Sequence, residues 1–118
     1  MRIEFWNFLQ QLVETSRLVI DRPKGSIHPR FPGKVYPVDY GYLGGTTTQD
    51  MGGVDIWVGS QGSKRVTGIL CSVDLLKRDT ELKILYECSD EEITSIDEFI
   101  NDGQMRAVYV KSDFKEGI

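Results

Sequence analysis

Apolar residues near the N-terminus recur with the spacing of one helix face. They fall at positions i, i+3, i+4, i+7 and i+8, and polar residues fill the opposite side. The residues of this stripe are Phe5, Phe8, Leu9, Leu12 and Val13. The pattern predicts an amphipathic helix over residues 5–13 that packs on a core.

Short runs rich in β-branched residues predict strands after this helix. These runs are residues 18–20, 54–58, 66–73 and 82–86. Residues 22–53 hold all four prolines and seven of the twelve glycines. This stretch therefore predicts turns and short extended pieces, the setting in which a rigid scaffold carries its working loops.

The last third of the chain changes to helical spacing. Ser89 with Glu92 and Ser95 with Glu98 both fit the capping-box pattern, so two helix starts compete. The sequence Asn-Asp-Gly at 101–103 is typical of a helix end.

Residues 105–110 fit either a further helical turn or a final strand. Together the elements predict an α+β, mainly β fold, a small barrel or curled sheet with a helix at each end. A chain of 118 residues is the size of one domain, so we expect a single domain over residues 1–118.

The composition of the chain argues against several classes of protein. The chain is 40% hydrophobic and 27% charged, as soluble globular proteins are, and its apolar runs are far shorter than the ~20 residues of a membrane span. No segment has the pattern of a secretory signal, and Cys71 and Cys88 are too few for a disulfide framework. We therefore expect a cytoplasmic protein with no membrane partner. Its net charge of −4 and scattered basic residues argue against a nucleic-acid partner.

Aspartates interrupt strands at places where packing alone does not put them. Asp21 follows three aliphatic residues, and Asp55 lies inside the run 54–58. The spacing of five residues from Asp50 to Asp55 recurs from Asp74 to Asp79. Two such pairs at one end of a barrel would place four carboxylates around a cavity, a donor set that suits hard cations such as Mg²⁺. Solvated loop acids remain the alternative.

Four motifs follow one another along residues 18–85. They are Ile-Asp-Arg-Pro-Lys-Gly-Ser at 20–26, Tyr-Pro-Val-Asp-Tyr-Gly-Tyr at 36–42, Asp50 to Asp55, and Asp74 to Asp79. Their order resembles that of the soluble, metal-dependent inorganic pyrophosphatases of the family I type. This resemblance implies an OB-like five-stranded β-barrel with flanking helices, and hydrolysis of pyrophosphate to two phosphates with Mg²⁺.

The resemblance also implies roles for particular residues. The metal ligands would be Asp50, Asp55, Asp74 and Asp79. Tyr36 would act in catalysis with Asp50 and Asp55. The substrate would be contacted by Tyr40, Arg30, Lys24 and Asp21, of which Asp21 stands where the family has a glutamate.

The chain departs from the family pattern at further positions, among them Gly53 in place of the family's proline. Gly52 stands where the family has the aspartate that helps to activate the nucleophilic water, and Glu81 stands where it has a lysine. Asp50 and Asp39 are the candidates for a replacement base. The chain between Asp21 and Tyr36 is also shorter than in the family, which opens the expected pocket.

Three functions stay open on these residues. The first is a Mg²⁺-dependent pyrophosphate hydrolase, with the variant that a larger phosphoanhydride is the substrate. The second is a module that binds metal and phosphate with impaired catalysis, for which Gly52 and Glu81 are the reason. The third is an interaction protein, and a homo-oligomer is compatible with each of the three.

Overall fold

Two helices and six strands make up the computed structural model, which describes residues 2–113. In chain order they are α1 (Ile3–Glu14), β1 (Arg17–Arg22), β2 (Asp39–Gly44), β3 (Val54–Val58), β4 (Val66–Asp74), β5 (Asp79–Tyr86), α2 (Asp90–Ile100) and β6 (Met105–Lys111). The N-terminal helix and the strands expected from the apolar runs are confirmed. Neither helix in residues 2–113 has the length and apolar character needed to cross a membrane.

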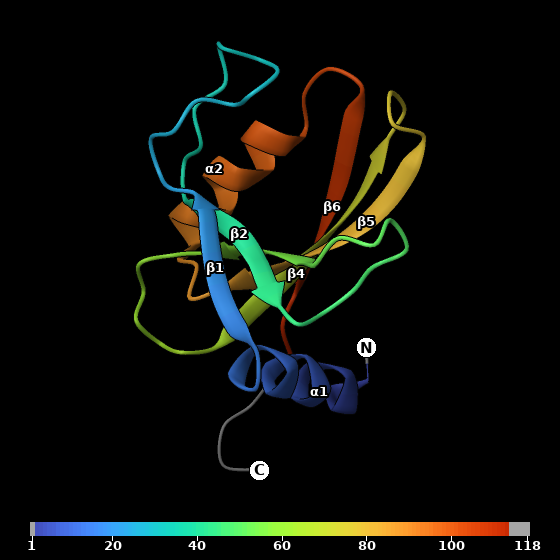
Figure 1. The fold of residues 1–118 in the computed structure, drawn as a ribbon. Coiled ribbons are helices and arrows are strands. Elements are labelled where there is room, and N and C mark those ends of the chain that lie inside the picture. The colour runs from blue at the N-terminus through green and yellow to red at the C-terminus, as the bar shows by residue number, and fades with distance from the viewer. Residues whose placement is uncertain (1, 114–118) are drawn as a thin grey trace.

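All six strands pair in one sheet, in the order β1-β2-β3-β5-β4-β6. Neighbouring strands are antiparallel except β3 and β5, which are parallel. Figure 1 shows β1 and β2 crossing in front of the other strands, so the sheet is strongly curled. The mainly β fold with flanking helices is confirmed, and the sheet has one strand more than the five that the resemblance implies.

The two features that the sequence left open have definite structures. Residues 105–111 form the extra strand, β6, which pairs with β4. Helix α2 begins after Ser89, whose hydroxyl accepts a hydrogen bond from the Glu92 N–H at 3.2 Å, while Glu92 Oε1 accepts one from the Ser89 N–H at 2.9 Å. Glu92 Oε2 also accepts from the Ser60 N–H at 3.1 Å, so the helix start anchors the loop that follows β3.

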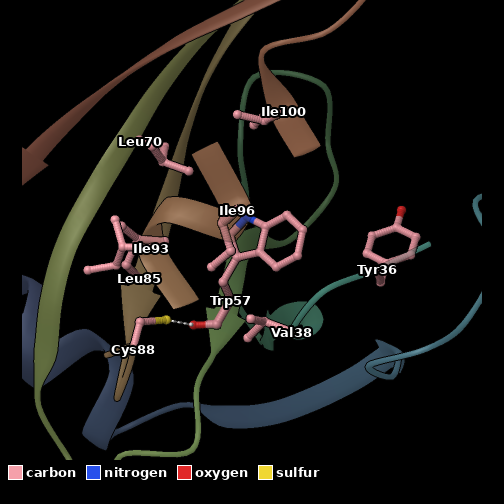
Figure 2. Packing of buried hydrophobic residues seen from close by; sticks show 9 residues of the cluster. All are labelled: Tyr36, Val38, Trp57, Leu70, Leu85, Cys88, Ile93, Ile96 and Ile100. Carbon is pink, nitrogen blue, oxygen red and sulfur yellow. Dashed lines mark hydrogen bonds between the residues drawn. The ribbon is translucent and has the colours of Figure 1, made fainter. Parts of the chain in front are cut away.

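The sheet buries apolar side chains on both of its faces. Ile56 and Trp57 are neighbours on β3 and belong to different core clusters, because successive strand residues point to opposite faces. The pairs 69–70 on β4 and 84–85 on β5 divide in the same way. One cluster includes residues of α1 and the other, seen in Figure 2, includes residues of α2. Burial on both faces of the sheet explains why the sequences of these strands are nearly continuous apolar runs.

Strand β2 lies within the glycine- and proline-rich stretch and depends on Gly41. This residue is the cross-strand partner of Ile20, and a Cβ at Gly41 would lie 1.8 Å from the carbonyl oxygen of Val19. Only glycine therefore fits at this position of the tyrosine motif. Gly41 thus allows β2 to pair closely with β1, while the other edge of β2, which carries Tyr40, pairs with β3.

The two free cysteines differ in reactivity. Cys71 is exposed, whereas Cys88 is buried with its sulfur 3.8 Å from the carbonyl oxygen of Trp57 (Figure 2). Burial raises the pKa of the Cys88 thiol to about 12, so the reactive thiolate is a small minority at pH 8. We expect DTNB to modify one thiol in the folded protein and two after denaturation. Rapid modification of both thiols in the folded protein would contradict this assignment.

Candidate active site

A buried lysine joins side chains from three neighbouring strands. Lys83 on β5 is the partner of Asp55 on β3, and β3 in turn pairs with β2, which carries Tyr40. The ammonium of Lys83 donates hydrogen bonds to Tyr40 OH at 2.8 Å, Asp55 Oδ2 at 3.0 Å and Glu81 Oε2 at 3.0 Å. An ammonium has three donors, so every one is used, and the Lys83 residue is only 6% exposed.

This environment fixes the charge of Lys83. Burial alone would lower its pKa, but the adjacent Tyr40, Asp55 and Glu81 raise the pKa above its ordinary value. Burial raises the pKa of the Tyr40 phenol. Lys83 therefore remains a cation between two carboxylates, with a neutral phenol as its third partner.

Two further acids face each other at the hairpin between β4 and β5. Asp74 ends β4, Asp79 begins β5, and the two are cross-strand partners. Asp74 Oδ1 accepts hydrogen bonds from the N–H groups of Leu76 at 2.9 Å and Lys77 at 3.1 Å, which shape the turn. The Lys77 ammonium lies 3.7 Å from Asp79 Oδ2 and 3.9 Å from Glu81 Oε1. Like charges on opposite strands repel, so a cation between these carboxylates would stabilise them.

Asp50 lies on the loop that precedes β3. Its Oδ1 accepts hydrogen bonds from the Thr48 hydroxyl and, at 3.0 Å, from the Gly52 N–H. These bonds hold the pKa of the Asp50 carboxyl below its ordinary value, with the Thr48 bond as the larger cause. Asp50 is therefore an oriented but weakly basic carboxylate.

These acids line one cavity of about 770 Å³, between the loop at 48–50 and the β4–β5 hairpin. Five carboxylates belong to its lining: Asp50, Asp55, Asp74, Asp79 and Glu81. Arg78 is the one cationic side chain in the lining as far as residues 2–113 are concerned. The structure thus brings together the four aspartates expected as metal ligands and adds Glu81 to them.

The other expected site residues lie outside the lining of this cavity. Tyr36 is buried and stacks on Tyr40, with 5.7 Å between the ring centroids. Lys24 and Arg30 are exposed between β1 and β2, and Asp21 is exposed on β1. Tyr40 is joined to the cavity acids through its hydrogen bond with Lys83 on β5.

The two candidates for a replacement base are placed differently. Asp39 is absent from the cavity lining, and its Oδ1 accepts a hydrogen bond from the Lys24 N–H at 2.7 Å. Asp50 belongs to the lining. Of the two carboxylates, only Asp50 is positioned to act on a molecule in the cavity.

Solved structures of inorganic pyrophosphatases resemble this arrangement of strands. One is from Coxiella burnetii, with 17% sequence identity and a TM-score of 0.52 over 69% of this chain and 67% of that chain. Another, from Neisseria gonorrhoeae, has 14% identity and a TM-score of 0.52 over 67% of this chain and 63% of that chain. The chain has the inorganic pyrophosphatase fold. No protein-family model matches it, and no match to a curated protein was found.

The donor set of the cavity in this pyrophosphatase fold suits Mg²⁺. Within residues 2–113, no three or more His, Cys, Asp or Glu side chains converge as a complete metal site. Mg²⁺ does not require such a set, because it keeps several waters and usually takes one or two carboxylates, with substrate phosphates as further ligands. Asp74 and Asp79 are cross-strand partners and provide two carboxylates of this kind. The residues present therefore fit the metal.

Lys83 is a site residue that the motif comparison missed. The resemblance implies a lysine at position 81, where the chain has glutamate, and Lys83 lies two residues further along β5. Positions two apart on a strand share a face, so its ammonium reaches the same acids. The signal in the sequence is the charge at every second position of Asp79, Glu81 and Lys83.

Replacing Lys83 by methionine is expected to destabilise the protein by about 1–3 kcal/mol. The change leaves the Tyr40 hydroxyl without its partner and two partly buried carboxylates without their cation. Urea unfolding measures the effect. The matched control is Lys77→Met, whose ammonium is half exposed and makes only long ion pairs, so its expected cost is about 0–1 kcal/mol. Equal destabilisation by the two substitutions would contradict a special role for Lys83.

Proposed function

We propose that this protein hydrolyses inorganic pyrophosphate to two phosphates in a Mg²⁺-dependent reaction. The observation that carries the proposal is the placement of five carboxylates around one cavity of a pyrophosphatase fold. We propose further that residues 1–118 form one such domain, and that it works in the cytoplasm, where its two free cysteines remain reduced.

The charge of the cavity explains why the reaction would need a metal. Five carboxylates repel a polyanion, and the three nearby cations Lys77, Arg78 and Lys83 do not offset all five. Asp55, Asp74 and Asp79, with Asp50 at the rim, are the residues that would hold Mg²⁺. A bound Mg²⁺ supplies positive charge that neutralises the phosphates and polarises a phosphoryl oxygen.

The side chains around the cavity have separate roles in this proposal. Lys83 holds Asp55 and Glu81 in place through its hydrogen bonds. Arg78 presents a planar set of donors that suits a phosphate group. Asp50 accepts the proton of the attacking water. Its lowered pKa makes it a weak base, so we expect slow turnover.

A second candidate function is a binding module without turnover. Gly52 favours it, because this position carries no carboxylate that could act as the base. Calorimetry with Mg²⁺ and imidodiphosphate, a non-hydrolysable analogue, detects binding in either case. Phosphate release is measured separately with pyrophosphate. Binding of the analogue without phosphate release from pyrophosphate identifies the binding module, and binding with release identifies the enzyme.

The test of the proposed function is phosphate release from pyrophosphate by the full chain. The reaction is run with excess Mg²⁺ and, in parallel, with the metal removed by EDTA. The proposal expects release that is proportional to protein concentration and abolished by EDTA. Release equal to that of a protein-free control would contradict it.

A further inference from the structure

Five charged side chains next to the cavity form a row of alternating sign. In order along the row they are Asp55, Lys83, Glu81, Lys77 and Asp79. The residues at 79, 81 and 83 take alternate positions on β5 and so share one face of the sheet, and Asp55 on β3 is the cross-strand partner of Lys83. The three acids of the row line the cavity, so its two lysines are the internal cations nearest to the expected metal ligands.

The two lysines of this row are held differently. The Lys83 side chain is 8% exposed, and its ammonium donates three hydrogen bonds of 2.8, 3.0 and 3.0 Å. The Lys77 side chain is 51% exposed, and its ammonium lies 3.7 Å from Asp79 Oδ2 and 3.9 Å from Glu81 Oε1, too far for a hydrogen bond. Exposed ion pairs of this length contribute little to stability, so Lys77 can leave these acids at low cost, whereas Lys83 cannot.

The backbone of Lys77 is anchored independently of its side chain. Its N–H donates a hydrogen bond to Asp74 Oδ1 at 3.1 Å, within the turn between β4 and β5. The four-carbon stem of a lysine is flexible and carries a compact point charge. The ammonium can therefore change partners while the turn keeps its hydrogen bond.

We infer that Lys77 is an exchangeable counter-ion of the site: its ammonium pairs with Asp79 and Glu81 when no metal is bound, and pairs with a phosphate of the substrate when Mg²⁺ is bound at Asp79. The inference rests on the proposed function, because it uses the same metal and the same substrate. A divalent cation at Asp79 repels the ammonium that lies beside the same carboxylate. Substrate phosphates usually complete the coordination of Mg²⁺, so a phosphate bound there would lie within reach of the displaced ammonium.

This exchange gives Lys77 opposite effects on two affinities. Without substrate its ammonium competes with Mg²⁺ for the acids, so removing the ammonium should tighten metal binding. With metal and substrate both present the ammonium attracts a phosphate, so removing it should weaken phosphate binding. A residue that only supported the turn would, when replaced, weaken both.

The test measures both affinities by calorimetry on the full chain and on Lys77→Met. The probes are Mg²⁺ alone and then imidodiphosphate at saturating Mg²⁺. Because two exposed ion pairs are lost, we expect Lys77→Met to lower the Kd of Mg²⁺ roughly three- to tenfold, and to raise the Kd of imidodiphosphate by a similar factor.

Two further variants serve as controls. Lys64→Met removes the same charge from an exposed residue that is not part of the cavity lining, so we expect it to change neither Kd. Lys77→Arg keeps a positive charge beside Asp79, so we expect it not to tighten Mg²⁺ binding and to retain the affinity for imidodiphosphate.

A spectroscopic readout follows the ammonium directly. The ¹³Cε resonance of Lys77 is identified by its absence from the spectrum of Lys77→Met, and that of Lys64 by its absence from the spectrum of Lys64→Met. We expect the Lys77 resonance to shift when Mg²⁺ is added and to shift again with imidodiphosphate, and the Lys64 resonance to stay in place.

The outcomes separate this inference from the proposed function. Mg²⁺ binding that Lys77→Met leaves unchanged or weakens overturns the inference and leaves the proposed function standing, as do equal effects of Lys77→Met and Lys64→Met. Tighter Mg²⁺ binding with an unchanged Kd of imidodiphosphate overturns the transfer of the ammonium to phosphate. No binding of Mg²⁺ or imidodiphosphate to the unmodified protein overturns both proposals.

Discussion

Asp55→Asn is expected to lower Mg²⁺-dependent phosphate release by about 10²-fold or more. The substitution removes one negative charge from the centre of the cavity and keeps the shape of the side chain. The amide oxygen can still accept the hydrogen bond that Lys83 donates to Asp55 Oδ2 at 3.0 Å, so the fold should persist. The loss would therefore report on chemistry and metal affinity, and initial rates with saturating Mg²⁺ measure it.

A suitable control for that experiment is Asp102→Asn. The Asp102 side chain is 63% exposed, its ion pair with Lys34 spans 3.6 Å, and it is not part of the cavity lining. We expect this variant to retain the rate of the unmodified protein. Activity that survives Asp55→Asn at the level of Asp102→Asn would remove Asp55 from the site.

Gly52→Asp is expected to raise the rate by about 10²-fold, since a positioned general base contributes roughly 10²–10⁴-fold. On the loop at 48–53, Asp50 is the acid that lines the cavity, and its hydrogen bonds lower the pKa of its carboxyl. A Cβ at Gly52 would lie 3.2 Å from Asp50 Oδ1 and meet nothing closer, so Asp50 need move by only a few tenths of an ångström. Asp50 is on an exposed loop, which can accommodate the shift.

Gly52→Asn separates the effect of a carboxylate at position 52 from the effect of the added side-chain volume. Both substitutions add nearly the same volume next to Asp50, but only aspartate can accept the proton of water. We expect the asparagine variant to match the unmodified protein in initial rate. A rate for Gly52→Asp no higher than that for Gly52→Asn would show that the missing carboxylate is not what limits turnover.

Local signals were sufficient to predict the elements whose stability is local. The apolar stripe of residues 5–13 depends on contacts along one helix face. The start of the second helix stayed open, because Ser95 with Glu98 has the same capping-box spacing as Ser89 with Glu92. The runs at 54–58 and 66–73 are apolar because both faces of the sheet are buried. In these segments the sequence pattern and the final environment agree.

Features that depend on distant partners were harder to predict. Strand β2 has few β-branched residues and exists because Gly41 lets it approach β1 closely. The parallel pairing of β3 with β5 joins segments separated by the whole of β4. Lys83 reads as an ordinary surface charge until that pairing places it against Asp55.

The residues of the candidate site show the same difference between local signals and distant partners. The equal spacing of Asp50 to Asp55 and of Asp74 to Asp79 left two interpretations open, a carboxylate cluster or solvated loop acids, and the four aspartates line one cavity in the structure. Spacing could not place Tyr36, which packs into the aromatic core beside Trp57 with 5.8 Å between ring centroids. Its aromatic partners Tyr40, Trp57 and Phe99 come from three different elements, which its own motif does not specify.

The measurement that tests this account most directly is an NMR titration of the ¹⁵N-labelled protein with Mg²⁺ and imidodiphosphate. It locates the bound metal and phosphate without requiring turnover. The account predicts saturable shifts of the backbone amides of the loop at 48–55 and of the hairpin at 74–81, which line the acidic cavity. Shifts confined to other parts of the chain, or no shifts at millimolar Mg²⁺ and analogue, would contradict the claim that this cavity is the active site.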